Sequence, residues 1–278
     1  YIITPETLKY GDYALVEVQA PYGYVLDDTP IPFSVNADNA EIENAVNIIK
    51  VEKSNTAQKG RISVTKRGDI FASVTALGSA IYADENGEIQ ESGENIYTPI
   101  FEEQGLAGAV YQVIAAEDIT TPDGTVRAAQ GDIVAELTTD EEGYAQTDLL
   151  YLGKYEITEI KAPNGYVLNS ELQTVELVYD GQEVEIKDSV DTAFVNEYQK
   201  LSVSMKKILE TDDTFNIGTN DEFRSVRFGL FAAEEITATD GHSIPENGLL
   251  STVYLNEDMT AVIAEKIPFG NYYVQEIS

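Results

Sequence analysis

Three polar residues stand where the alternation of a β-strand places apolar ones. In a strand, residues i, i+2 and i+4 share one face. Three predicted strands carry apolar stripes that end in a lysine, a glutamate and an asparagine: Ile62, Val64 and Lys66; Tyr155, Ile157 and Glu159; and Phe194 and Asn196. A buried ammonium and a buried carboxylate each cost several kcal/mol unless they are paired. The pattern therefore predicts that Lys66, Glu159 and Asn196 meet inside the protein.

Two kinds of chemistry fit such a trio. One is a plain structural ion pair between Lys66 and Glu159, capped by Asn196. The other is a reaction: desolvation lowers the pKa of the lysine and raises that of the glutamate, so a neutral amine lies beside a neutral acid. The amine is then a nucleophile and the carboxyl a general acid and base. Holding the three groups in contact supplies a high effective molarity. Lys66 and Asn196 would then form an isopeptide bond and release ammonia.

The same residue types recur elsewhere in the chain. Near the C-terminal end, Lys207 follows Val203 and Met205, and Glu276 follows Tyr272 and Val274. Near the N-terminal end, Glu17 follows Tyr13 and Leu15, and Asn55 aligns with Asn196, with Asn47 as a second candidate. No strand upstream of Glu17 provides a counterpart of Lys66. Lys9 lies just before the strand of Glu17, so it is a poor substitute for that counterpart. The stripe before Asn55 contains Lys53 and is therefore less apolar than expected.

Internal repeats set the domain organisation. GDYALVEVQAPYGYVLDD at 11–28 recurs as GKYEITEIKAPNGYVLNS at 153–170, and residues 110–124 recur at 227–241. Residues 55–66 recur at 196–207. Repeats of this kind predict three copies of one unit. We expect a first module at 1–59 that lacks its beginning, a complete middle module at 60–199 with an insertion at about 67–104, and a third module at 200–278 that lacks its end.

The elements that position these residues are predicted to be strands. Short alternating runs rich in β-branched and aromatic residues are separated by turn dipeptides such as Asp123-Gly124 and Glu142-Gly143. This pattern predicts an all-β chain of tandem antiparallel β-sandwich modules, Ig-like in architecture. We expect one short helix at 115–119, and a loop or hairpin in the insertion.

Composition excludes several classes of function. The 278 residues include no cysteine, no tryptophan and one histidine, with 49 acidic and 17 basic side chains and a formal charge of −32. Disulfides, thiolate metal sites and His-based triads are therefore excluded or improbable. So large a negative charge repels phosphate backbones and anionic lipids. We expect no nucleic-acid partner, no membrane contact by this segment, no metal and no cofactor.

At the chemistry-bearing residues the chain resembles a known family. Residues 153–166, GKYEITEIKAPNGY, resemble the E-box of CnaB or SpaA-type repeats in Gram-positive pilins and adhesins, and Gly60 to Lys66 resembles their lysine-bearing first strand. Residues 105–109 resemble the next strand entry. The resemblance implies a prealbumin-like β-sandwich on a secreted, wall-attached protein. It also implies that Lys66 is the nucleophile, Asn196 the electrophile and Glu159 the proton shuttle, with Glu17, Glu276, Lys207 and Asn55 as their counterparts.

The function expected from these features is structural. The leading prediction is a stalk segment, stabilised by isopeptide bonds that form once within the chain, so the protein is no enzyme in the ordinary sense. Its partners would be neighbouring modules of the same surface protein. The alternative is an adhesin module that binds a host protein or glycan through the 67–104 insertion. A carbohydrate-active enzyme would need a pair of catalytic carboxylates, and no spacing singles one out.

Three further features of the sequence are weaker indications of function. Arg67-Gly68-Asp69 spells an integrin-recognition tripeptide, but it directly follows Lys66 in a predicted strand, and a chance occurrence is the simpler interpretation. Two acidic clusters, at 84–86 and 212–213, have oxygen ligands suited to calcium but lack EF-hand spacing, which favours solvated loops. His242 follows a predicted turn and is expected to be exposed.

Overall fold

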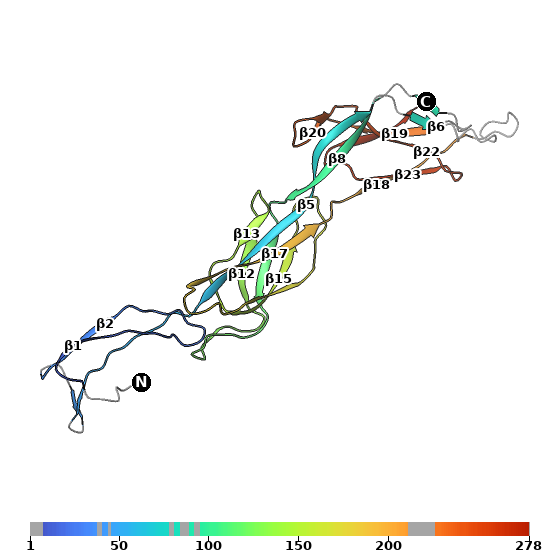
Figure 1. The fold of residues 1–278 in the computed structure, drawn as a ribbon. Coiled ribbons are helices and arrows are strands. Elements are labelled where there is room, and N and C mark those ends of the chain that lie inside the picture. The colour runs from blue at the N-terminus through green and yellow to red at the C-terminus, as the bar shows by residue number, and fades with distance from the viewer. Residues whose placement is uncertain are drawn as a thin grey trace.

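The structure is a computed structural model that describes residues 8–37, 41–43, 46–77, 81–83, 89–91, 95–210 and 226–277. These residues form an elongated string, in which the segments before residue 60 and after residue 199 lie at opposite ends of the segment between them (Figure 1). We call the segments 1–59, 60–199 and 200–278 the first, middle and third module. Their regular elements are all strands, which confirms the predicted all-β class. In this part of the chain no helix is long and apolar enough to span a membrane.

The middle module is a sandwich of two sheets. One layer holds four strands in the order β12 (Ile133–Thr138), β9 (Val110–Ala115), β15 (Gly153–Lys161) and β16 (Gln173–Leu177). The facing layer is built on β5 (Lys59–Leu77), which pairs with β13 (Tyr144–Gln146), β14 (Leu150–Tyr151) and β17 (Ile186–Asn196). Alternate residues of both layers meet in one buried core that includes Ile62, Val64, Ile157 and Phe194. The alternation predicted from the sequence therefore places these stripes correctly.

Pairing within the sandwich departs from a purely antiparallel pattern at one point. The first strand, β5, and the last, β17, lie side by side and run parallel, with Phe194 opposite Lys66 and Asn196 opposite Gly68. Because these two strands open and close the module, their shared register brings residues 130 positions apart into contact.

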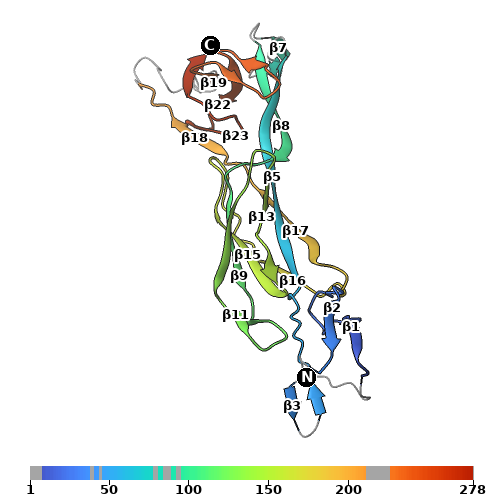
Figure 2. The ribbon, with the colours of Figure 1, turned by 90° about the vertical axis from the view of Figure 1, so that its left-hand side faces the viewer.

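The insertion is a long β-hairpin. Strand β5 continues past Lys66 out of the sandwich and pairs with β8 (Ile96–Gly105), from Arg67 opposite Gly105 to Leu77 opposite Ile96. A β-bulge between Phe71 and Ser73 interrupts the alternation. Further along, β6 (Ile81–Ala83) pairs with β7 (Ile89–Glu91). Figure 2 shows β5 running from the middle module up to the third.

The two outer modules are smaller in their described parts. In the first, β1 (Gly11–Leu15) pairs with β2 (Ile31–Val35) and β3 (Glu41–Glu43) with β4 (Val46–Ile48). In the third, β19 (Arg227–Ala232) lies between β22 (Leu249–Tyr254) and β24 (Tyr272–Ile277), β18 (Leu201–Lys206) pairs with β23 (Thr260–Glu265), and β20 (Ile236–Thr237) pairs with β21 (Ser243–Ile244).

The helix expected at 115–119 is wrong. Strand β9 ends at Ala115, the amide of Ala116 donates to the carbonyl oxygen of Lys154 at 2.9 Å, and Ile119 begins β10 (Ile119–Thr120), which pairs with β11 (Val126–Ala128). The backbone donors of this segment are thus satisfied by distant residues rather than by a helical turn, and the tertiary context overrides the propensity of its alanines and glutamate.

Candidate functional site

The three residues predicted to meet do meet, at one end of the middle sandwich. Lys66 and Asn196 come from the parallel neighbours β5 and β17. Glu159 comes from β15 in the facing layer, where it lies opposite Tyr111 of β9. The side chains of Lys66 and Glu159 are wholly buried, and Asn196 is 2% exposed. Each stripe does end in a polar group inside the protein.

The contacts among these groups form a closed triangle. The Lys66 Nζ lies 3.0 Å from Glu159 Oε1 and donates a hydrogen bond to Asn196 Oδ1. The Asn196 Nδ2 donates to Glu159 Oε1 at 2.9 Å and to Oε2 at 3.0 Å. The amide carbonyl thus faces the lysine and the amide nitrogen faces the carboxylate. This is the orientation in which an amine could attack the amide carbon while the carboxyl serves the departing nitrogen.

The surroundings of the lysine are apolar and aromatic. The rings of Tyr111 and Phe194 have their centroids 5.7 and 5.8 Å from Lys66 Nζ. Burial lowers the pKa of Lys66, and the hydrogen bond and charge of Glu159 oppose this shift without cancelling it. The site therefore favours a neutral amine more than water does.

Backbone groups hold the carboxylate and the lysine in place. The amide of Asn169, in the loop after β15, donates to Glu159 Oε2 at 2.7 Å. The amide of Lys66 donates to the carbonyl of Gly143 at 2.6 Å, and the carbonyl of Lys66 accepts from Leu106 at 3.0 Å. Gly143 has φ of 77°, and a Cβ there would overlap the backbone of both Lys66 and Leu106. Only glycine fits this position without displacing the lysine.

Tyr111 is a site residue that the three polar stripes did not single out. Its side chain is fully buried, and its hydroxyl has no hydrogen-bond partner among the described residues. Burial and the adjacent Glu159 raise its pKa. The only sequence feature that could have identified Tyr111 is its position, because it shares a strand face with Val113 in a segment of repeated sequence. The same pattern is typical of any core tyrosine, so it does not indicate a site residue.

The first module holds part of the same arrangement. Asn55 Nδ2 donates to Glu17 Oε2 at 2.6 Å and to the carbonyl of Val25, and the amide of Asp27 donates to Glu17 Oε2 at 3.2 Å. Glu17 and Asn55 are half-buried. Lys53 instead forms an ion pair with Asp27 at 3.1 Å. Lys9 contributes its carbonyl to the hydroxyl of Tyr13, and the side chain of Asn47 lies outside the described residues.

In the third module the lysine and glutamate contact one another but are not buried. Lys207 Nζ and Glu276 Oε2 form an ion pair, with side chains 28% and 48% exposed. Met205 and Val274 on the same stripes are half-buried. Without burial, water screens this pair, so the desolvation that acts on Lys66 is much weaker here.

The weaker motifs are placed as follows. Arg67 pairs with Glu103 at 2.8 Å, and Asp69 forms an ion pair with Lys266 of the third module, so the charged ends of the Arg-Gly-Asp tripeptide are both engaged within a strand. His242 is exposed and lies 2.9 Å from Asp240. The acidic clusters at 84–86 and 212–213 lie outside the described residues.

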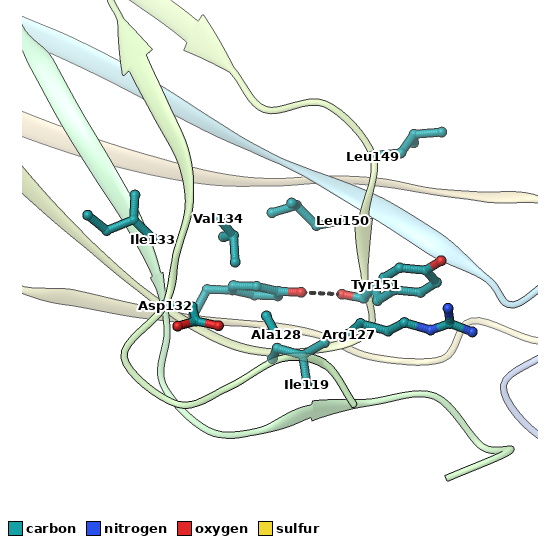
Figure 3. A pocket seen from close by; sticks show the side chains of 10 residues that line it. Ile119, Arg127, Ala128, Asp132, Ile133, Val134, Leu149, Leu150 and Tyr151 are labelled. Atoms are coloured by element: carbon teal, nitrogen blue, oxygen red, sulfur yellow. Dashed lines mark hydrogen bonds between the residues drawn. The ribbon is translucent and has the colours of Figure 1, made fainter. Parts of the chain in front are cut away.

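A hollow of about 450 Å³ is drawn in Figure 3. One of its lining residues, Leu150, pairs with Gly60 at the start of β5, so the hollow lies at the other end of this strand's sandwich portion from Lys66. Its floor includes Tyr155, whose hydroxyl donates to the carbonyl of Tyr151 at 2.6 Å. The two charged residues of its lining are already engaged, Arg127 with the hydroxyl of Thr121 and Asp132 with the amide of Ala129. The trio at the other end is therefore the better candidate site.

Comparison with known proteins places the fold. A family model described as SpaA, prealbumin-like fold domain, matches residues 2–50 and 101–190, together half of the chain. The second matched range begins within the hairpin, so most of the insertion lies outside the matched residues. No curated protein matches the sequence.

One solved structure supports this fold. The chain is similar to the Bacillus anthracis TIE protein at 20% identity with a TM-score of 0.54, covering 98% of this chain and 37% of that one. A streptococcal ancillary pilin (17% identity, TM-score 0.31, 98% of this chain and 67% of that one) and the shaft pilin SpaA of Lactobacillus rhamnosus GG (12%, 0.28, 79% and 87%) also match. The similarity to the first concerns the fold, and the chain spans little more than a third of it.

Proposed function

Because the chain belongs to the family of SpaA-type prealbumin-like fold domains, we propose that it is a stalk segment of a Gram-positive surface protein. Its middle module is stabilised by an isopeptide bond between Lys66 and Asn196 with Glu159 as proton shuttle. The observation that carries this proposal is the closed triangle of lysine, glutamate and asparagine in a dry core. A plain ion pair would not require an asparagine whose carbonyl faces the lysine and whose nitrogen faces the carboxylate.

The proposed reaction balances within the trio. Neutral Lys66 Nζ attacks the side-chain carbonyl carbon of Asn196, and Glu159 passes a proton from the attacking nitrogen to the departing one. The C–N bond of the asparagine amide breaks, a new amide joins Nζ to the same carbon, and ammonia leaves. Burial supports the first step, because it lowers the pKa of the lysine. The hydrogen bonds from Asn196 Nδ2 to both carboxylate oxygens support the proton transfer.

The position of the bond suits a load-bearing role. Lys66 and Asn196 lie on the first and last strands of the module, which run parallel. A covalent link there would carry tension from one strand directly to the other, so the segment between these two residues, which are 130 positions apart, would not extend. The proposed modules, 1–59, 60–199 and 200–278, would then follow one another as a string on the outside of the cell wall, with neighbouring modules as their partners.

Pulling the chain by its ends in a single-molecule force experiment tests this role. The folded chain is expected to show no extension from residues between 66 and 196. Lys66→Ala is expected to add an unfolding step of about 400 Å, the extended length of the released loop. A step of that length in the unmodified chain would contradict the proposal.

The first and third modules carry incomplete versions of the site. Glu17 and Asn55 are in contact, and Lys207 contacts Glu276. Among the described residues, the pair in the first module has no lysine beside it and the pair in the third module has no asparagine. We therefore propose the same roles for these residues only where that third group is supplied.

A further inference from the structure

The hairpin of the middle module contacts the third module along one face. Phe71 and Val74 of β5 and Tyr97 of β8 pack against the core of the third module, which includes Leu230 and Ile244. These aromatic and aliphatic side chains are half-buried although they belong to an insertion. One face of the described stem of the hairpin is thus covered by a neighbouring module.

Polar contacts fix the same surface. Lys266 of the third module forms an ion pair with Asp69, and its Nζ lies 4.3 Å from the ring centroid of Phe101. The amides of Thr239 and Asp240 donate to the carbonyls of Phe71 and Ala72 at 3.1 and 3.3 Å. These contacts lie close to the apolar ones along β5, so both the side chains and the backbone of the hairpin take part.

The sheets of the two modules are continuous through the hairpin. Strand β8 pairs with β5 on one side and, through Ile96 and Leu249, with β22 of the third module on the other. The resulting order is β13, β5, β8, β22, β19 and β24. A single sheet therefore crosses the junction, and Figures 1 and 2 both show β5 and β8 bridging the two modules.

A second contact, shared by both junctions of the chain, shows what the hairpin adds. The turn after each E-box strand packs against the following module: Gly23 lies against Pro122 of the middle module, and Gly165 lies against Phe269 of the third. At the second junction Phe269 also stacks on Tyr198, with ring centroids 4.7 Å apart. This turn ties neighbours at one edge, and the hairpin contacts the third module along a separate line.

We propose that the 67–104 hairpin is an inter-module splint: its inner face is a docking surface for the third module of the same chain, and it holds that module at a fixed orientation. Two separated lines of contact prevent rotation where one would act as a hinge. This inference does not require the Lys66–Asn196 bond, because the docking contacts are all non-covalent and lie beyond Lys66. It gives the insertion a structural role in place of host-ligand binding by its stem.

Distance measurement between two spin labels tests the splint. The chain contains no cysteine, so Glu136→Cys in β12 and Val262→Cys in β23, both exposed, give one label on each module. The full chain is expected to give one narrow distance distribution. Replacing residues 70–102 with Asn-Gly joins Asp69 to Glu103, which are already cross-strand neighbours, and is expected to broaden the distribution several-fold. An equally narrow distribution in the shortened chain would overturn the proposal.

Point variants keep the test decisive if the shortened chain does not fold. Phe71→Ser combined with Lys266→Ala removes apolar and polar docking contacts and is expected to broaden the distribution as well. Arg67→Ala combined with Glu103→Ala is the matched control, because it removes an ion pair within the hairpin whose side chains are half exposed, and it should leave the distribution narrow. Equal effects of the two double variants, or no effect of the first, would contradict a docking role. The intact mass of each variant reports separately on the Lys66–Asn196 bond.

Discussion

At the scale of single residues, burial distinguishes the two repeated lysines. Lys66 and Lys207 occupy equivalent positions in their repeats and both contact a glutamate, but only the first pair is fully buried. Desolvation lowers the pKa of Lys66, whereas water screens the exposed pair of Lys207 and Glu276. The same sequence motif therefore lies in different environments in the two modules, and the proposed reaction is expected only in the buried one.

Glu159→Gln tests the role of the carboxylate. We expect no loss of ammonia, because an amide cannot shuttle the proton. The lysine then loses the groups that raise its pKa, so its folded-state pKa falls further below the unfolded value. Between these two pKa values the unfolded state binds more protons, so the free energy of unfolding rises with pH and falls as pH drops through the folded pKa. Denaturant unfolding at several pH values measures this. If the free energy of unfolding of Glu159→Gln did not change with pH between these two pKa values, Lys66 would be hydrated in this variant, which would contradict its burial in a dry core.

Tyr111→Phe separates packing from proton chemistry. The hydroxyl is buried without a partner among the described residues, so its removal is expected to leave ammonia loss intact. The free energy of unfolding should stay the same or rise by about 1 kcal/mol, since an unsatisfied polar group is removed. Intact mass and denaturant unfolding measure the two effects. Slower bond formation in this variant would instead show that the hydroxyl takes part in the reaction.

At the scale of elements, the turn before β13 sets the position of the lysine strand. Gly143→Ala places a Cβ against the backbone of Lys66 and Leu106. We expect a loss of stability and incomplete cross-linking. Gly124→Ala is the matched control: its φ is 83°, similar to the 77° of Gly143, but a Cβ there meets nothing within 4 Å. The control should cost only the backbone strain, about 1–2 kcal/mol, and should cross-link fully. Equal behaviour of the two variants would contradict the positioning role of Gly143.

Strand alternation in the sequence predicted the strands that carry the site. The elements whose structure depends on residues far along the chain could not be predicted in this way. The stripes ending at Lys66, Glu159 and Asn196 could be identified because each is a local period-two pattern with a β-branched or aromatic core face. The hairpin stem was harder, since a bulge at Phe71 and Ser73 breaks its alternation and its apolar residues are covered by a module far along the chain. The segment at 115–119 has helical propensity, and pairing of Ile119 with Ala128 overrides it.

At the scale of the whole molecule, the proposed bond and the splint act on different parts of the string. The bond would close a loop of 130 positions within the middle module, and the hairpin fixes the next junction. Closing a loop of that size restricts the unfolded state by about 5 kcal/mol in the chain-entropy model. Lys66→Met, which keeps an apolar stem in the core, is therefore expected to lower the melting temperature of the middle module and its resistance to proteolysis. An unchanged melting temperature would argue against a covalent link.

The charge of the molecule fits an extended, solvated stalk. The chain has a net charge of −32, and most acidic side chains of the described residues are exposed, while Glu159 is buried with Lys66. The absence of cysteine means that a disulfide cannot supply the covalent link within a module. A Lys–Asn bond would take that place.

The most direct test of the proposed cross-link is the intact mass of the folded chain, followed by peptide mapping. We predict a mass lower than that of the sequence by one ammonia, and a branched peptide that joins Lys66 to Asn196. The deficit should disappear in Lys66→Ala and in Glu159→Gln, and it should persist in Lys207→Ala. A chain with its full sequence mass, or a deficit that survives Lys66→Ala, would contradict the proposed bond.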